Sequence, residues 1–163
     1  MKGLDELLAR EDLKELKARY FRFTDMHDFE SFGKLFVDDA IMEAAQLAGP
    51  STLVARGRDE IVRQAALASE GAIKIHHGHN CEITIGDRDT ASGIWAVEYL
   101  FFDENSSTSR RLRHNFAYYY ENYVRVADEW KFAAVKIVNV HTVVDGGPPS
   151  SELGPSGLLR SGV

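Results

Sequence analysis

Cysteine is almost absent from the sequence, because Cys81 is the single cysteine among 163 residues. One cysteine excludes an intrachain disulfide and fits a reducing compartment, so we expect a cytoplasmic protein. A lone thiol is more often a small core residue than a nucleophile. Cysteine-based catalysis is therefore not the chemistry that the composition favours.

Long apolar runs and blocks of positive charge are missing as well. No apolar stretch reaches the roughly 18–20 residues that a membrane span needs. Residues 1–17 form a charged helical pattern rather than a signal peptide. The net charge is −6, with 19 basic against 25 acidic residues. The sequence therefore predicts neither a membrane nor a nucleic acid as partner.

What remains has the composition of one soluble domain, with 44% hydrophobic residues and a length that suits a real core. No repeat or linker divides residues 1–144, which we expect to fold as a single domain. Residues 145–163 are rich in Gly, Pro and Ser. We expect this tail to be mobile, or to lie over a neighbouring subunit or the mouth of a pocket.

Helical periodicity comes first along the chain and predicts one or two amphipathic helices over residues 4–26. Asp28 can cap a second, short helix, whose apolar side would carry Phe29, Phe32, Leu35 and Phe36. A strand over 40–44, a return strand over 53–56 and a third helix over 58–69 follow. Gly71 is the expected C-terminal cap of that helix.

After Gly71 the hydrophobic period changes from 3.6 to 2, and four long strand patterns follow. They cover residues 72–86, 90–103, 110–127 and 129–144. Helices followed by an antiparallel meander indicate an α+β fold. Strands of this length require strong curvature. We therefore expect a cone-shaped barrel, an antiparallel sheet wrapped around the N-terminal helices, with an apolar interior that suits a small molecule.

The strand pattern over 90–103 is apolar on both faces. One side carries Trp95, Val97, Tyr99 and Phe101, and the other carries Ile94, Ala96, Leu100 and Phe102. The helices can cover one of these faces, but the other then needs a second cover. We therefore expect a homo-oligomer, a dimer or trimer, that packs through the sheet.

Two distant stretches hold the residues suited to proton transfer: YFRFTDMHDF at 20–29 and IHHGHN at 75–80. A carboxylate and an imidazole are the smallest set of groups that cofactor-free acid–base catalysis needs. Asp25 falls in the last turn of the predicted helix, where the dipole disfavours a purely stabilising carboxylate but suits one that holds an imidazolium. An exposed loop carboxylate is the alternative. For Asp28, an N-cap role is a full explanation.

Three histidines, His76, His77 and His79, stand within four residues. Alternate strand residues face opposite sides, so at most His77 and His79 share a face. No Glu-x-x-His motif or cysteine pair completes a ligand set, so we expect no metal. Strict alternation groups His77 and His79 with Ile73, Ile75, Ile83 and Ile85 and turns His76 outward. A bulge at Gly78 would break that alternation, so periodicity does not choose among the three.

Several segments together resemble a known family. EDLKELKARYFRFTDMHDFESFGKLFVDDA, IHHGHNCEITI, TASGIWAVEY and YENYVRVADEWKF occur in the order found in SnoaL-like domains of the nuclear transport factor 2-like superfamily. The similarity spans roughly residues 4–142 and implies the cone-shaped, cystatin-like fold. Within the superfamily the chain most resembles a lyase group, namely scytalone dehydratase, bile acid 7α-dehydratase and hexachlorocyclohexane dehydrochlorinase. That group uses an Asp–His pair and no cofactor.

The resemblance implies that Asp25 and His76 form the catalytic pair, since Gly78 and Gly93 keep the family's spacing around the histidine. It also implies a distorted strand there. Tyr20 takes the place of a pocket tyrosine of the bile acid enzyme. Tyr99 and Asn139 stand where that enzyme has a pocket Asp and Arg, so the substrate-specific set differs.

These observations lead to the hypothesis of a cofactor-independent lyase, most simply a dehydratase. His76 would abstract a proton, and Asp25 would fix the imidazole tautomer and stabilise the imidazolium. The expected substrate is a small hydrophobic cyclic molecule, with Tyr20, Met42, Trp95, Tyr99, Tyr119 and Asn139 as the binding residues. An isomerase or polyketide cyclase with the same base, and a non-catalytic binding protein, are the alternatives.

Overall fold

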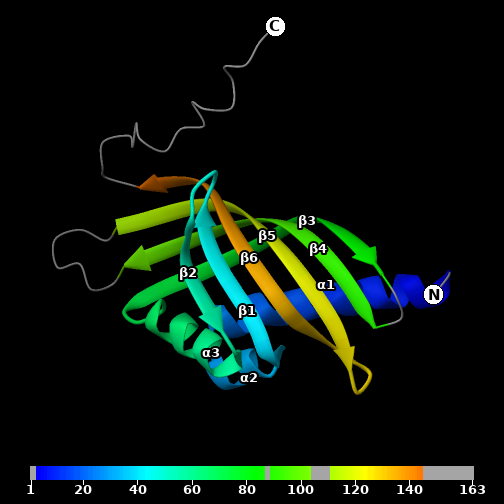
Figure 1. The fold of residues 1–163 in the computed structure, drawn as a ribbon. Helices are drawn as coiled ribbons and strands as arrows, with labels where there is room; N and C mark the ends of the chain where they lie inside the picture. Colours follow the sequence, from blue (N-terminus) through cyan, green and yellow to red (C-terminus); the bar gives the residue numbers. More distant parts are fainter. Residues whose placement is uncertain (1–2, 87–88, 104–110, 145–163) are drawn as a thin grey trace, which may run out of the picture.

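The computed structural model describes residues 3–86, 89–103 and 111–144 (Figure 1). The tail expected over 145–163 and most of the polar loop expected over 103–109, between two of the strand patterns, lie outside these residues. The elements are α1 (Leu4–Asp25), α2 (Phe29–Gly33), β1 (Phe36–Gln46), β2 (Ser51–Arg56), α3 (Arg58–Leu67), β3 (Ala72–Ile85), β4 (Thr90–Asp103), β5 (Arg111–Val126) and β6 (Glu129–Val144). The predicted α+β class is confirmed.

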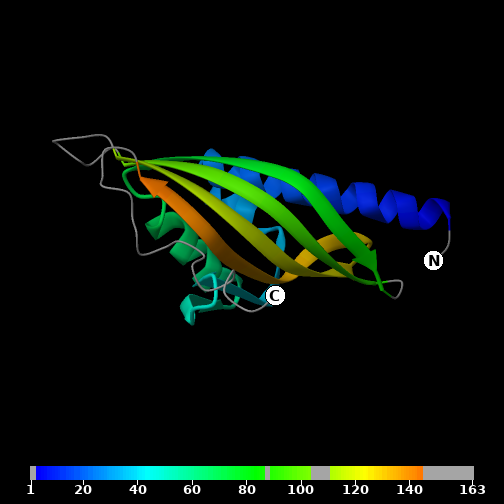
Figure 2. The same ribbon diagram turned by 90° about the horizontal axis from the view of Figure 1, so that it is seen from above.

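Within the described residues all strands join one six-stranded sheet, in the order β2-β1-β6-β5-β4-β3. Four neighbouring pairs are antiparallel, but β1 and β6 run parallel. The sheet is strongly curved, as expected, and α1 lies across its concave side along β3 (Figure 2). Because β2 and β3 are free edges, the sheet is open rather than a closed barrel. The parallel pair also corrects the expectation of a wholly antiparallel sheet.

The N-terminal helical pattern forms one helix. Its buried side carries Ala9, Leu13, Leu16, Lys17, Tyr20, Phe21 and Thr24. Beyond Asp25 the backbone of His27 adopts a left-handed conformation with φ 56°, which ends the helix. Asp28 then begins α2, where its side chain accepts a hydrogen bond from the backbone N–H of Ser31 at 3.0 Å. The predicted N-cap role of Asp28 is confirmed.

Two predicted boundaries are wrong. The strand expected over 40–44 begins at Phe36, because Phe36 already pairs with Phe132 of β6. Leu35 and Phe36 therefore lie beyond the end of α2 rather than on its apolar side. Helix α3 ends at Leu67 with Ala68 as its C-cap. Gly71, expected as the cap, instead takes φ 65° in the turn that leads into β3.

The strand β3 does not alternate along its whole length. Gly78 pairs with Val97 of β4, yet Cys81 pairs with Trp95, so β3 holds one extra residue between these two pairs. This is a β-bulge. Before it, His76 turns its side chain to the concave side; after it, Ile83 does so.

Strict alternation therefore assigned the first half of β3 to the wrong faces. Ile73 and Ile75 are exposed on the outer face, where His77 and His79 are exposed too. The alternative of a bulge next to Gly78 is the one that the structure contains.

Inward-facing side chains form rows across the sheet, because paired residues of neighbouring strands share a face. One row consists of His76, Tyr99, Asn115 and Thr142. A neighbouring row, nearer the start of β3, consists of Lys74, Phe101 and Arg113. Deeper in the cone, Cys81, Trp95, Tyr119 and Ile137 form a row in the core.

The convex face of the sheet is left bare by the helices (Figure 2). Its exposed apolar side chains include Ile73, Ile75, Phe116, Tyr118, Tyr120 and Val143. Homo-oligomer formation through this face stays a prediction. Among the described residues, no helix is long and apolar enough to span a membrane.

Candidate active site

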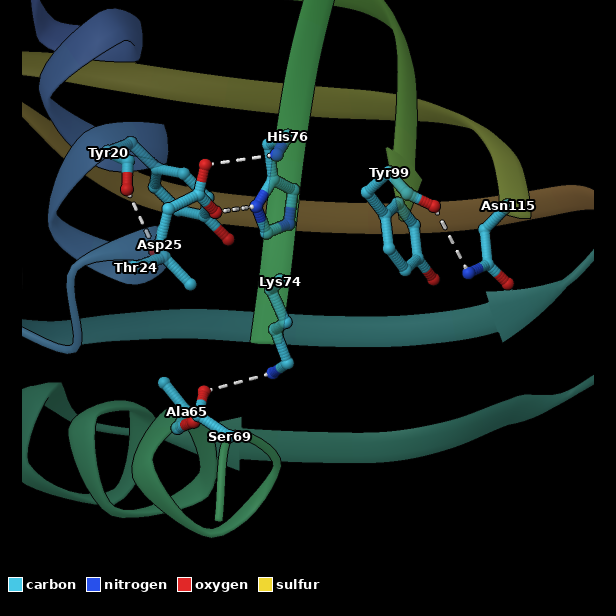
Figure 3. A network of polar contacts seen from close by, with 9 residues as sticks. All are labelled: Tyr20, Thr24, Asp25, Ala65, Ser69, Lys74, His76, Tyr99 and Asn115. Carbon is cyan, nitrogen blue, oxygen red and sulfur yellow. Dashed lines mark hydrogen bonds and ion pairs between the residues drawn. The ribbon is translucent and has the colours of Figure 1, made fainter. Parts of the chain in front are cut away.

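The end of α1 and the middle of β3 meet at one carboxylate–imidazole contact (Figure 3). Asp25 Oδ1 lies 2.5 Å from His76 Nδ1, and Asp25 Oδ2 accepts a hydrogen bond from the backbone N–H of His76 at 3.0 Å. The two side chains are 22% and 7% exposed. Both carboxylate oxygens thus bind the same residue, which fixes the histidine's backbone and ring together. We call this pair the dyad.

The carboxylate sets the tautomer of the imidazole. A carboxylate only accepts hydrogen bonds, so the proton of neutral His76 lies on Nδ1 and the lone pair lies on Nε2. Nε2 has no hydrogen-bond partner among the residues that the structure describes. The ring therefore presents a free acceptor on the side opposite to Asp25, as a general base requires.

Two aromatic rings hold the imidazole in place. Phe21 stacks on it with ring centroids 5.4 Å apart and an angle of 11°, and Tyr99 stacks with centroids 5.3 Å apart and an angle of 27°. Gly78 makes room for this arrangement, because a Cβ atom there would lie only 2.7 Å from Phe21 Cε2. The stack restricts the imidazole to one orientation.

Burial lowers the pKa of His76 from its ordinary value of 6.5, although the hydrogen bond and charge of Asp25 act in the opposite direction. The ammonium groups of Lys17 and Lys74 lower it further. His76 is therefore neutral at physiological pH, the form that can accept a proton.

A buried ion pair that the sequence analysis did not identify lies beneath the dyad. Lys17 Nζ of α1 contacts Glu121 Oε1 of β5, and these side chains are 1% and 0% exposed. The ammonium also lies 4.1–4.5 Å from the ring centroids of Tyr20, Phe21 and Tyr119. Since Phe21 stacks on His76, the cation is one side chain away from the base.

Two signals in the sequence mark this pair. Lys17 lies four residues from Leu13 and from Phe21, so helical spacing puts it on the buried side of α1. Glu121 alternates with Tyr119 and Tyr123, so it shares their face of the strand. An acid and a base on two predicted core faces would have suggested an ion pair.

The predicted binding residues lie at different depths. Tyr99 belongs to the dyad's own stack, while Tyr20 and Tyr119 are buried below it with ring centroids 6.2 Å apart. Trp95 donates a hydrogen bond to the hydroxyl of Tyr123 at 2.9 Å. Met42 is buried on β1.

Asn139, the last predicted binding residue, belongs to a band of polar side chains on the concave side. Its amide nitrogen donates to Gln46 Oε1 at 3.1 Å and to Thr142 Oγ1 at 2.8 Å. Thr142 donates in turn to Asn115 Oδ1 at 2.9 Å. The interior of the cone, expected to be apolar, therefore contains buried polar groups as well.

A groove of about 520 Å³ runs beside the dyad between α1 and the sheet. It is lined by Lys14, Lys17, Ala18, Phe21, Arg22, Asp25, Met26, His76, Gly78 and Trp95. Of the predicted site residues it brings together Asp25, His76 and Trp95. The other predicted binding residues are not in its lining. Its volume suits a small molecule.

The remaining histidines of β3 and β5 belong to the outer face. His79 Nε2 lies 3.1 Å and His114 Nε2 lies 2.6 Å from the two carboxylate oxygens of Glu98. Across residues 3–86, 89–103 and 111–144, no three His, Cys, Asp or Glu side chains gather in a way that could hold a metal ion.

Comparisons with known proteins agree with this fold. A profile of the SnoaL-like domain matches residues 5–136. Among solved structures, the hexachlorocyclohexane dehydrochlorinase LinA Type2 matches with a TM-score of 0.77 and 19% identity, over 91% of this chain and 99% of that chain. A scytalone dehydratase-like protein from Novosphingobium aromaticivorans matches with a TM-score of 0.75 and 21% identity, over 85% and 89% of the two chains.

A third similar structure has no known function. This protein from Nostoc punctiforme has a cystatin-like fold and matches with a TM-score of 0.62 and 20% identity, over 87% of this chain and 95% of that chain. At such identities the likeness establishes the fold alone. What the chain does must therefore be argued from its own site.

Proposed function

The chain belongs to the SnoaL-like domain family, and we propose that it is a cofactor-independent lyase, most simply a dehydratase. The observation that carries the proposal is the 2.5 Å contact between Asp25 Oδ1 and His76 Nδ1 in a largely buried setting. The names of two structural neighbours, a dehydrochlorinase and a scytalone dehydratase-like protein, support an elimination. The proposed substrate is a small cyclic molecule.

The chemistry begins at Nε2 of His76. This nitrogen takes a proton from a carbon beside a carbonyl group, and the electron pair of the broken C–H bond forms a carbon–carbon double bond. This double bond first joins the carbon to the carbonyl carbon, as an enolate; when the carbonyl re-forms, the electron pair moves to the next bond and the C–O bond on the next carbon breaks. The imidazolium returns its proton to the departing oxygen, so that water leaves and the base is regenerated. Asp25 stabilises the imidazolium between these two transfers.

Tyr99 is the best-placed hydrogen-bond donor for the substrate's carbonyl oxygen, because its ring stacks directly on His76. Burial raises the pKa of Tyr99, so its hydroxyl keeps its proton at neutral pH. Burial raises the pKa of Tyr20 and Tyr119 in the same direction, but both lie deeper in the core. A neutral phenol can stabilise a developing enolate. Positioned acid–base groups contribute roughly 10²–10⁴-fold to a rate, enough for an activated substrate.

Two readouts on a hydroxylated cyclic ketone test this proposal. With 3-hydroxy-1-tetralone in D₂O, proton NMR follows deuterium entry at the carbon beside the carbonyl, and absorbance follows water loss to 1-naphthol. We expect the wild-type protein to accelerate both. His76→Ala should abolish the acceleration, and Asp25→Asn should reduce it strongly because an amide favours the other tautomer.

His77→Ala is the matched control, since His77 is the next residue of β3 and faces outward. It should retain the wild-type rates. Acceleration that survives His76→Ala would refute the proposed base. Deuterium entry without water loss, followed by an isomerised or cyclised product, would replace the lyase with an isomerase or polyketide cyclase. Binding without any exchange, across a panel of such ketones, would leave a non-catalytic binding protein. In a protein that only binds its ligand, we would expect Asp25 and His76 to lie too far apart for a hydrogen bond. Here Asp25 Oδ1 and His76 Nδ1 are in hydrogen-bond contact.

A further inference from the structure

Two cationic side chains lie one row away from the dyad. Lys74 of β3 pairs with Phe101 of β4, which pairs with Arg113 of β5. Lys74 Nζ lies 5.8 Å and Arg113 Cζ lies 4.0 Å from the centroid of the Phe101 ring. The two cations thus flank one aromatic side chain on the concave side of the sheet.

Neither cation forms an ion pair within the described part of the chain. Lys74 Nζ donates a hydrogen bond to the hydroxyl of Ser69 at 3.0 Å, across from the dyad's strand to the end of α3 (Figure 3). The Arg113 guanidinium lies against the Phe101 ring. Other cations of the chain do have carboxylate partners, such as Arg10 with Glu6, Lys34 with Glu30 and Arg63 with Glu60. Within the described residues, Lys74 and Arg113 thus differ from these cations in having no carboxylate partner.

The arrangement is unfavourable for the empty protein. Burial lowers the pKa of Lys74 to about 8, and the nearby charge of Arg113 lowers it too, while Asp25 acts in the opposite direction. Like charges held together in a partly desolvated place repel each other unless an anion lies between them. An anionic ligand would remove this cost on binding.

A second unsatisfied group lies on the same concave side. The side chain of Asn139 is buried, and its Oδ1 has no hydrogen-bond partner in the described residues. Buried acceptors are almost always paired. A ligand hydroxyl would supply the missing donor, which again indicates a polar ligand rather than a purely apolar one.

We propose that the substrate is a hydroxylated cyclic acid whose carboxylate is bound by Lys74 and Arg113. Guanidinium and ammonium groups are the natural partners of a carboxylate, and both lie beside Phe101 on the concave side of the sheet. A carboxylate in this row places the rest of the molecule beside Tyr99 and His76 in the next row. The inference rests on the proposed function and narrows its substrate class from neutral rings to acids.

A binding comparison tests this subsite without turnover. The full chain is titrated calorimetrically with 2-naphthoate and with 2-naphthamide, which has the same shape and no charge. We expect the wild-type protein to bind the acid at least about tenfold more tightly, the effect of one charged hydrogen bond. Lys74→Gln and Arg113→Gln should each bring the two affinities close together. Lys74→Arg should keep the preference, since it keeps the charge.

Arg125→Gln and Lys136→Gln are the matched controls, because they remove the same charges from β5 and β6 away from this row. Both should bind like the wild type. Equal binding of acid and amide by the wild type would overturn the proposal, as would a preference that survives both glutamine variants. Tighter binding of 2-naphthyl phosphate than of 2-naphthoate would overturn the assignment to a carboxylate.

Failure of this subsite and failure of the lyase proposal give different results. A preference for the acid in a protein that catalyses no deuterium exchange would support the subsite and refute the lyase. Deuterium exchange on neutral ketones, together with equal binding of 2-naphthoate and 2-naphthamide, would support the lyase and refute the carboxylate subsite.

Discussion

Replacing Lys17 by Met isolates the energetic role of the buried ion pair. The substitution keeps most of the side chain's volume but removes the ammonium that contacts Glu121 and the rings of Tyr20, Phe21 and Tyr119. Glu121 would then keep only the hydrogen bond that the hydroxyl of Tyr123 donates to it. A carboxylate would remain in the core without a counter-charge.

The expected cost follows from this burial. Removing one partner of a fully buried pair costs about 3–5 kcal/mol of the free energy of unfolding. Domains of this size have about 5–15 kcal/mol in total, so the variant should lose a large part of its stability. Replacing both partners, as Lys17→Met with Glu121→Gln, leaves no buried charge. We expect this double variant to be more stable than Lys17→Met alone.

Urea denaturation of the four proteins of this cycle, at several pH values, is the assay. Burial already raises the pKa of Glu121, and loss of Lys17 raises it further. An acid whose pKa is raised in the folded protein stabilises the folded state at low pH. This stabilisation is lost as the pH rises through the pKa that the acid has in the folded protein. The destabilisation by Lys17→Met should therefore shrink as the pH falls.

Glu121→Gln has the opposite dependence. It leaves Lys17 without its carboxylate, and burial lowers the pKa of Lys17. A base with a lowered folded pKa favours the folded state at high pH, so this penalty should shrink as the pH rises. A cost below about 1 kcal/mol for Lys17→Met, the range of an exposed pair, or a common pH trend for both single variants, would refute a buried ionised pair.

Three further predictions concern the dyad and the sheet. Gly78→Ala forces a methyl group against Phe21 and should cost about 1–3 kcal/mol in urea denaturation, whereas Gly49→Ala, whose nearest contact would be 3.5 Å, should be nearly neutral; equal costs would contradict the tight packing at Gly78. Because burial lowers the pKa of His76, the acid limb of kcat/KM should be centred below pH 6.5, and an acid limb centred above 6.5 would contradict this. Tyr118 is 45% exposed on the convex face, so Tyr118→Glu should convert a sedimenting oligomer into a monomer, and a wild-type protein that sediments as a monomer would contradict packing through this face.

The fold was largely accessible from the sequence because its patterns are long. The apolar side of α1 repeats over six turns, and the last four strands are 14–16 residues long and alternate over most of that length. The parallel pairing of β1 with β6 was not accessible. That pairing brings together residues about 95 positions apart, as Met42 with Val135, and local periodicity carries no information on such a contact.

The candidate site was accessible only in part. The place of Asp25 at a helix end follows from local spacing, but the choice of His76 depended on family resemblance. A β-bulge is a tertiary adjustment that leaves little mark on composition, so alternation alone gave the wrong face. Lys17 and Glu121 were overlooked because charged residues usually face solvent, and their burial depends on pairing across α1 and β5.

The bulge in β3 decides which side chains of this strand face the site, and so which residue can act as the base. If the strand kept all its residues but paired with β4 without the bulge, one uninterrupted alternation would run from Ala72 to Ile85. With Ile83 anchored in the core, the first half of the strand would turn over and present Ile73 and Ile75 to the interior, in place of Lys74 and His76. Every residue of the site would still be in the sequence, yet the imidazole and the ammonium would be in water. Only the bulge therefore keeps the proposed base in the site. With Asn80 deleted, six positions instead of seven would separate His76 from Ile83, and a regular strand would hold both on the concave side.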